Sequence, residues 1–332
     1  MALARYKTYA WTRSRRRHSG RDSVAPVTSV LLKTAGPLCR LVPMPWLLFL
    51  ILSSSARPAD SGLEARIHAL IESQTRPAPD VGLVLLPLDG RGAVMIEPDR
   101  VFHAASTMKV PVMIELFRQA KARRLRLDDP LPVVNDFHSI VDGSVYHLSV
   151  GDDSDADVYK AVGKTMTLRE LCEAMITVSS NLAANLLIER LGVENIRARV
   201  ARLGTAGMNV RRGVEDQKAF DQGLNNTTTA RGLAVLLQKL GKGKAVDARS
   251  DAEMVAILKR QRFNDGIPAG VPEGTPVAHK TGSITKIHHD AAIVYGRRPY
   301  VLVILMRGIQ DQKESAALMA AISKAVWTSL EE

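Results

Sequence analysis

The sequence predicts an α/β fold of the α+β kind, in which strands from both ends of the chain form one antiparallel sheet beside an inserted helical subdomain. Apolar runs typical of strands occur at 81–86, 93–96, 291–295 and 300–306, and a further strand is predicted at 277–283. Between the two groups of strands, apolar residues recur three and four positions apart, which is the period of a helix. Two amphipathic segments, 61–73 and 314–330, predict terminal helices that flank the sheet. We expect a cleft between the sheet and the helical subdomain to hold the functional site.

Turn residues separate the expected strands and helices. Residues 89–92, Asp-Gly-Arg-Gly, join the first two strands and predict a hairpin. The helical period covers 107–120, 167–177, 182–191, 228–240 and 251–261. The segment 135–163 is polar and rich in Asp, Ser and Gly, so we expect a surface excursion there. Its carboxylates lack the spacing of a calcium-binding loop.

The N-terminal region differs in composition from the rest of the chain. An apolar run at 46–52 ends in small residues, which is typical of a secretory signal and too short to cross a bilayer. A short uncleaved anchor is the alternative, and Met44 is an alternative start. The expected organisation is a basic extension with a secretory signal at 1–59 and a single domain at 60–332, whose sheet part covers 60–100 and 275–332 and whose helical part covers 101–274.

Positive charge is concentrated at the N-terminus rather than on the expected domain. The formal net charge is +11, but residues 1–60 carry ten Lys and Arg against two Asp. The remaining residues hold 35 basic against 32 acidic side chains, so a basic surface for nucleic acid is not predicted. The two cysteines, Cys39 and Cys172, lie on either side of the expected cleavage point. We therefore expect neither a disulfide framework nor a thiolate metal site.

A serine and a lysine stand one helical turn apart where the first long apolar helix is expected to begin. Ser106 lies near the N-terminus of that helix and Lys109 is three residues on, so both share a helix face. A serine hydroxyl is a weak nucleophile at neutral pH and needs a base within hydrogen-bond reach, which an uncharged lysine can supply. The same spacing also arises by chance, as a helix N-cap followed by a solvated lysine.

Two further triplets follow Ser106 along the chain. Ser-Ser-Asn at 179–181 separates two helical segments, and Lys-Thr-Gly at 280–282 lies in a terminal strand. With the Ser-x-x-Lys pair, they resemble the motif set of penicillin-recognising serine enzymes, which includes class A β-lactamases and D,D-peptidases. Residues 166–171 and the threonines at 227–229 are also similar to class A β-lactamases. The resemblance covers about 61–330 and implies a β-lactamase/transpeptidase-like fold.

The resemblance implies a role for the residues of the first two motifs. Ser106 would be acylated by an amide substrate, and Lys109 would act as its base or proton relay. Ser179 would pass a proton to the leaving nitrogen, and Asn181 would hold the substrate amide.

The strand motif would bind the other end of the substrate. Lys280 and Thr281 would bind its carboxylate, and Gly282 would let its backbone lie close to the strand. The oxyanion hole would consist of the backbone N–H groups of Ser106 and Ser283.

The sequence departs from the class A pattern at two places. The middle residue of the second motif is usually Asp and is Ser180 here, which we expect to alter local structure more than chemistry. The glutamate that hydrolyses the acyl-enzyme in class A enzymes follows an arginine and precedes an asparagine, ahead of the threonine-rich helix start. Glu215 is the best match, although the spacing of this stretch is altered.

A structural role for Glu215 is an equal alternative. Its carboxylate would then form an ion pair with Arg211 or Arg212. Asp216 and Asp221 are weaker matches to the deacylating residue.

Three histidines lie close to the last motif. His288 and His289 lead into a strand, where adjacent side chains point to opposite faces and do not converge on one ion. We expect no metal and no cofactor. One of these two histidines is expected to line the cleft, because the turn that carries them follows the strand of Lys280. His279 is expected to be a packing or surface residue.

Together these features predict an exported serine hydrolase that forms an acyl-enzyme, most directly a β-lactamase. A D,D-carboxypeptidase acting on cell-wall peptides would use the same residues. A non-turnover penicillin-binding sensor usually carries transmembrane helices, which nothing after Leu52 provides. We expect a monomer whose partner is a small β-lactam or a cell-wall peptide, with no nucleic-acid partner and no stable membrane insertion.

Overall fold

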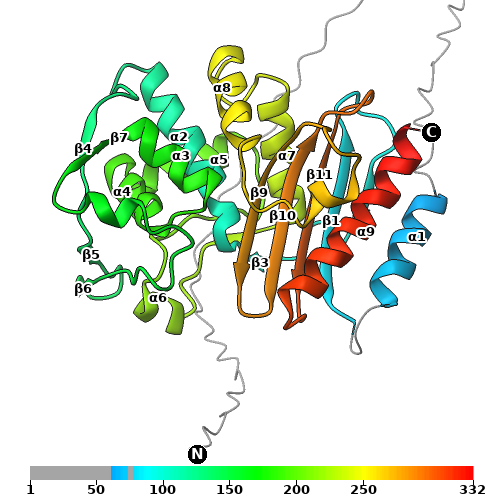
Figure 1. Cartoon of the computed structure of the whole chain (residues 1–332), viewed down its shortest axis with the longest axis horizontal. Coiled ribbons are helices and arrows are strands. Elements are labelled where there is room, and N and C mark those ends of the chain that lie inside the picture. The colour runs from blue at the N-terminus through cyan, green and yellow to red at the C-terminus, as the bar shows by residue number, and fades with distance from the viewer. Residues whose placement is uncertain (1–60, 74–77, 332) are drawn as a thin grey trace, which may run out of the picture. The chain divides into compact units, whose positions relative to one another are not determined.

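A five-stranded antiparallel sheet forms the centre of the fold (Figure 1). The structure is a computed structural model, and it describes residues 61–73 and 78–331. The strands of the sheet are β1 (Asp80–Pro87), β2 (Val94–Ile96), β9 (Val277–Ile284), β10 (Ile287–Val294) and β11 (Tyr300–Arg307). Their order across the sheet is β2-β1-β11-β10-β9, so segments from both ends of the chain meet where β1 pairs with β11. This confirms the predicted antiparallel sheet.

The terminal helices cover one face of the sheet. Helices α1 (Ser61–Glu72) and α9 (Gln312–Glu331) lie side by side there, as Figure 1 shows in blue and red. Alternate residues of β11, such as Leu302 and Ile304, point to this face and join its apolar core. Their neighbours Val301 and Val303 point to the opposite face, which is buried under the helical part.

The helical part lies against the second face and one edge of the sheet. Its main helices are α2 (Lys109–Lys121), α3 (Leu168–Thr177), α4 (Asn181–Leu191), α5 (Val193–Arg202), α7 (Ala230–Gly241) and α8 (Ala248–Leu258). Helix α7 packs against β1, β10 and β11, and one apolar core runs from the sheet face into the helices. The sheet and the helical part therefore share a core.

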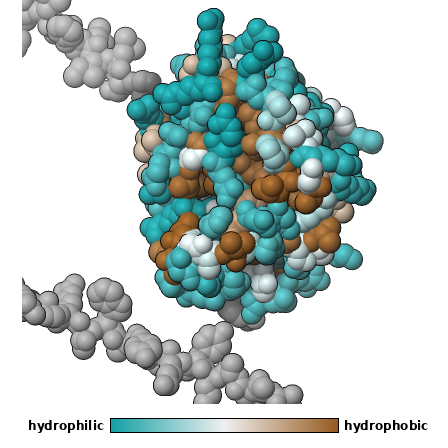
Figure 2. Space-filling view, turned by 90° about the vertical axis from the view of Figure 1, so that its left-hand side faces the viewer, coloured by the Kyte–Doolittle hydropathy of each residue, from teal (hydrophilic) through white to brown (hydrophobic). Residues whose placement is uncertain are grey.

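Short elements complete the helical part. They are β3 (Phe102–His103) with β8 (Thr227–Thr228), β4 (Pro130–Pro132) with β7 (Thr165–Thr167), β5 (Phe137–His138) with β6 (Val145–Tyr146), α6 (Gln217–Asp221), and the single turns η1 (Ala105–Met108) and η2 (Val158–Ala161). The expected surface excursion at 135–163 thus contains a small hairpin. The single turn η3 (Ile267–Gly270) lies instead against α9, where Ile267 joins the apolar core beneath the terminal helices. In Figure 2, hydrophobic side chains are interspersed with hydrophilic ones on the face of the helical part.

The expected extension and signal at 1–59 lie outside the described residues. Within the described residues, none of the helices has the length and apolar character needed to cross a membrane.

Candidate active site

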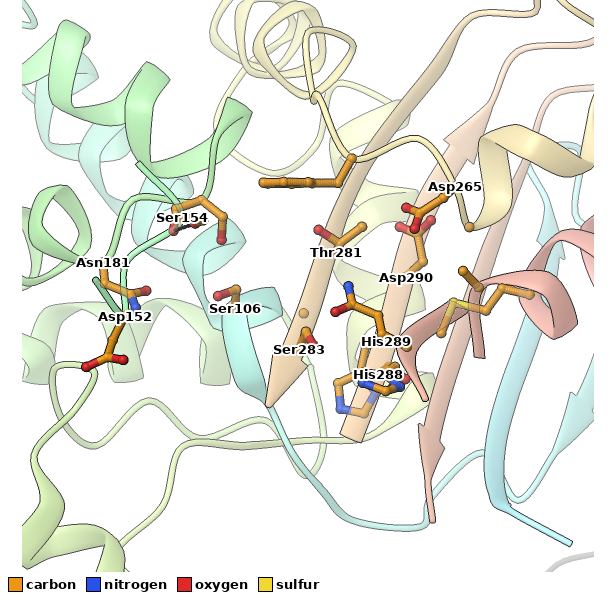
Figure 3. A pocket seen from close by; sticks show the side chains of 17 residues that line it. Ser106, Asp152, Ser154, Asn181, Asp265, Thr281, Ser283, His288, His289 and Asp290 are labelled. Atoms are coloured by element: carbon orange, nitrogen blue, oxygen red, sulfur yellow. Dashed lines mark hydrogen bonds between the residues drawn. The ribbon is translucent and has the colours of Figure 1, made fainter. Parts of the chain in front are cut away.

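Ser106 opens onto a pocket between the sheet and the helical part. It lies in η1, a 3-10 turn that runs directly into α2. The pocket has a volume of about 300 Å³. In Figure 3, Ser106 lies between Asn181 on the helical side and Thr281 and Ser283 on β9. Residues from all three motifs line it: Ser106, Ser179, Asn181, Thr281, Gly282 and Ser283.

Lys109 is fully buried beneath the pocket, which excludes a solvated surface lysine. Its Nζ donates to the backbone oxygen of Ser179 at 2.6 Å and lies 3.2 Å from Ser179 Oγ. It also donates to Asn181 Oδ1 at 2.7 Å. Burial lowers the pKa of Lys109 to about 7, although the negative charges of Asp153 and Glu215 act in the opposite direction. At neutral pH this lysine therefore exchanges between its charged and uncharged forms, as a general base requires.

Ser179 lies between two buried lysines. Lys280 Nζ donates to Ser179 Oγ at 3.0 Å and to the backbone oxygen of Thr281 at 2.9 Å. The pKa of Lys280 is held well below its usual range, mainly by burial and secondly by the charge of Lys109. When both lysines donate to Ser179 Oγ, its two lone pairs are occupied and its own O–H is available to a group in the pocket.

The turn that carries Ser179 has a strained backbone. Ser179 has φ 61°, in the left-handed region that side chains other than glycine rarely adopt. Ser180 then caps α4, since its Oγ accepts from the N–H of Ala183 at 3.3 Å. Two residues that the sequence does not single out, Asp153 and Ser154, also form hydrogen bonds with this turn. The only sequence signal for them is the run of polar residues at 151–155.

Glu215 lies in a second pocket that shares Ser106 and Asn181 with the first. Asn181 Nδ2 donates to Glu215 Oε1 at 2.6 Å. Burial raises the pKa of Glu215, the hydrogen bond from Asn181 lowers it, and the charge of Asp153 raises it again. The preceding residue, Val214, is fixed by two hydrogen bonds between its backbone and the side chain of Asn185, at 2.7 and 3.0 Å.

Arg212, which lies close to Glu215 in sequence, has other partners. Arg212 donates to the backbone oxygens of Leu224 and Gly213 and to Asn225 Oδ1, each at 3.0 Å. Among the described residues, no ion pair joins Glu215 to Arg211 or Arg212.

The two weaker carboxylate matches are also engaged in hydrogen bonds. Asp216 is buried, with its oxygens accepting from Ser139 Oγ at 2.8 Å and from the N–H of Ile140 at 2.9 Å. Asp221 is exposed and accepts from Gln217 Nε2 at 2.7 Å.

Gly282 lets β9 approach the turn of Ser106. A Cβ at this position would lie 3.1 Å from the backbone nitrogens of Ser106 and Thr107, and 3.2 Å from Ala105 Cβ. These distances are shorter than ordinary contacts, so a larger residue would displace η1 or β9. Since β9 is the edge strand of the sheet, its free edge forms one wall of the pocket.

Both His288 and His289 line the pocket. They lie inside β10 and not in a turn before it, which corrects the sequence prediction. Burial lowers the pKa of His289 to about 4. His279 is a buried packing residue whose Nδ1 lies 3.0 Å from Asp290 Oδ1. In the described part of the chain, no three His, Cys, Asp or Glu side chains are grouped so as to hold a metal ion.

Comparisons with known proteins identify the family and the fold of this chain. The sequence profile of the beta-lactamase enzyme family matches residues 62–330. A beta-lactamase of Bacillus licheniformis is 27% identical over 259 residues, which cover 75% of this chain and 79% of that protein.

Solved structures show the same fold. The structure of PBP-A has a TM-score of 0.71 at 27% identity, covering 82% of this chain and 97% of that one. A mutant of PBP-A, in an acyl-enzyme complex with penicillin G, has a TM-score of 0.70 at 26% identity over the same shares of the two chains. Because the family profile covers most of its length, the chain belongs to the beta-lactamase enzyme family.

Proposed function

We propose that this protein is an active-site serine hydrolase that forms an acyl-enzyme at Ser106 and hydrolyses β-lactams. One observation carries the proposal: Asn181 bonds both to buried Lys109, three residues after Ser106, and to Glu215, in the pocket that Ser106 also lines. The site therefore contains a base suited to acylation and a separate carboxylate suited to deacylation.

In the acylation step, Ser106 Oγ attacks the carbonyl carbon of the amide and its proton passes to uncharged Lys109. The backbone N–H groups of Ser106 and Ser283 stabilise the negative oxygen of the tetrahedral intermediate. The C–N bond then breaks, and the nitrogen takes the proton of Ser179. Ser179 regains a proton from protonated Lys109, whose Nζ lies 3.2 Å from its oxygen.

Substrate binding uses the β9 side of the pocket. Thr281 and Ser283 present hydroxyl groups to a substrate carboxylate. Lys280 is buried and acts on this side of the pocket through its hydrogen bond to Ser179 Oγ. Asn181 offers its side-chain amide to the amide on the acyl side of the substrate.

In the deacylation step, Glu215 takes a proton from a water molecule that attacks the ester carbonyl. The ester C–O bond breaks, and the proton that Glu215 took from the water passes to Ser106 Oγ, which restores the resting enzyme. Glu215 must be ionised to act as a base. Because its pKa is raised, deacylation should slow at a higher pH, as the pH falls, than it would with an ordinary glutamate.

A D,D-peptidase that acts on cell-wall peptides is the second candidate. The similarity to PBP-A supports it, because a mutant of that protein was solved as an acyl-enzyme complex with penicillin G, which is the adduct expected where deacylation is slow. The two functions differ in the lifetime of the β-lactam acyl-enzyme. For either function, we propose an exported monomer.

The test is mass spectrometry of the purified protein mixed with penicillin G, with Ser106→Ala as the control. A β-lactamase gives an adduct that requires Ser106 and disappears as hydrolysed product forms. A persistent adduct assigns the protein to the second candidate, and no adduct refutes both.

A further inference from the structure

We infer that Asp153 is a positioning residue of this site, because its carboxylate fixes the start of α4 and thereby orients Ser179 and Asn181 against Lys109. The inference rests on the proposed function. Asp153 belongs to the surface excursion at 135–163 and to none of the three motifs.

The carboxylate of Asp153 binds the first turn of α4. Both of its oxygens lie 2.9 Å from the backbone nitrogen of Asn181, and Oδ2 also accepts from the N–H of Leu182 at 3.0 Å. Ser180 Oγ lies 3.4 Å from the same carboxylate. The first N–H groups of a helix have no partner within the helix, and a negative charge there is favourable to the helix dipole.

The excursion also binds the backbone on both sides of Ser179. Ser154 Oγ lies 2.8 Å from the backbone oxygen of Val178 and 3.2 Å from that of Ser179. The strained φ of 61° at Ser179 persists only if its surroundings hold it. Asp153 on one side and Ser154 on the other therefore fix a turn that would relax if it were free.

The motif itself cannot supply this carboxylate. Position 180 is a neutral serine, and its hydroxyl oxygen accepts from the N–H of Ala183. The N–H groups of Asn181 and Leu182 are left to Asp153. The negative charge at the start of α4 thus comes from a segment 28 residues earlier in the chain.

Asp153 also affects the proton affinity of the site. Its charge raises the pKa of Lys109 against the effect of burial, and it raises the pKa of Glu215 as well. The charged groups that interact with Lys109 are Asp153 on the excursion, Glu215 on the segment before α6, and Lys280 on β9. Removing the charge of Asp153 lowers the pKa of both catalytic groups, so each reaches its active, deprotonated form at a lower pH.

Asp153→Asn is therefore expected to have two separable effects. The plateau rate of acylation by penicillin G falls roughly 10- to 100-fold, because Ser179 and Asn181 are misplaced. The acidic limb of the pH profile moves to lower pH, because the charge of Asp153 no longer favours the charged form of Lys109, and a loss of global stability alone would not cause this shift.

Two variants serve as comparisons. Asp157→Asn removes the same charge from an exposed position in the same excursion, where Asp157 pairs with Lys160. It should leave both the plateau and the limb unchanged. Ser154→Ala removes the neighbouring hydrogen bonds without a change in charge, so it should lower the plateau and leave the limb in place.

A second measurement does not depend on turnover. NMR titration of ¹³C-labelled lysine in the full chain reports the pKa of Lys109 directly, with folding checked by circular dichroism. A lower plateau rate together with a lower Lys109 pKa in Asp153→Asn than in Asp157→Asn supports the inference, and values equal to those of Asp157→Asn overturn it. If Asp153→Asn does not fold, Asp153→Glu keeps the charge, and it must keep the Lys109 pKa while lowering the plateau. A wild-type protein that penicillin does not acylate refutes the proposed function, whereas the titration still decides the role of Asp153.

Discussion

The side-chain amide of Asn181 connects Lys109 to Glu215. Its oxygen accepts from Lys109 Nζ at 2.7 Å, and its nitrogen donates to Glu215 Oε1 at 2.6 Å. This arrangement fixes the amide orientation, because exchanging oxygen and nitrogen would place a donor against the ammonium group and an acceptor against the carboxylate. A change of protonation at either neighbour therefore alters the hydrogen bonds of the residue proposed to bind the substrate amide.

Glu215→Gln separates acylation from deacylation. Glutamine retains an oxygen that can accept from Asn181, but it cannot take a proton from water. We expect acylation by penicillin G to continue while turnover falls by about 100-fold or more, so that the acyl-enzyme accumulates. Stopped-flow kinetics and intact-protein mass spectrometry measure both steps.

The matched control for Glu215→Gln is Asp221→Asn, which neutralises an exposed carboxylate in the same region. It should turn over penicillin at the wild-type rate. Wild-type turnover by Glu215→Gln would exclude Glu215 from the chemistry and leave it a structural role.

The pH dependence of acylation should reflect Lys109. Only the uncharged amine accepts the proton of Ser106, and the pKa of Lys109 is lowered to about 7 by burial. The rate should therefore be maximal above this pH and fall as the pH decreases through about 7. Lys109→Arg stays protonated at all these values and should acylate about 100-fold more slowly or worse, without this limb. A variant that keeps the limb would show that Lys109 is not the base.

The sheet and the three motifs could be predicted because their signals are local. Strands such as β1 and β11 contain continuous apolar runs, and the triplets at 179–181 and 280–282 lie within a few residues of sequence. Helix α5 was missed, since only Ile196 and Val200 of its ten residues are buried among charged neighbours. Its apolar face is too narrow to give a clear helical period.

The contacts that complete the site depend on distant parts of the chain. Asp153 contacts Asn181, and Asn185 contacts Val214, across 28 and 29 residues. The spacing of apolar residues along the sequence does not indicate such long-range pairs. The sequence pattern places the start of β10 too late for a related reason. His288 is polar yet buried, and its Nδ1 lies 2.6 Å from Ser315 Oγ on α9. A buried polar residue inside a strand needs a hydrogen-bond partner. The sequence alone does not show which residue provides it.

Gly282→Ala should disturb the contact between β9 and the turn of Ser106. The added Cβ would lie 3.1 Å from two backbone nitrogens, and backbone atoms cannot move aside as a side chain does. We expect a loss of stability of about 1–3 kcal/mol and slower acylation. Gly151→Ala is the control, since its Cβ would meet only Ser149 Oγ at 3.6 Å. Thermal unfolding and acylation rates that match those of Gly151→Ala would show that the close approach is not required.

Asp216 is expected to stabilise the fold rather than to take part in catalysis. Its buried carboxylate accepts from Ser139 Oγ, from the N–H of Ile140 and from the N–H of Ala219 at 3.1 Å, so it ties the β5–β6 hairpin to α6. Asp216→Ala leaves these donors without a partner, and we expect the free energy of unfolding to fall by about 2–4 kcal/mol. Asp221→Ala, at an exposed position five residues on, should change it by less than about 0.5 kcal/mol. Urea denaturation of both variants measures the difference, and equal midpoints would mean that the hairpin does not depend on Asp216.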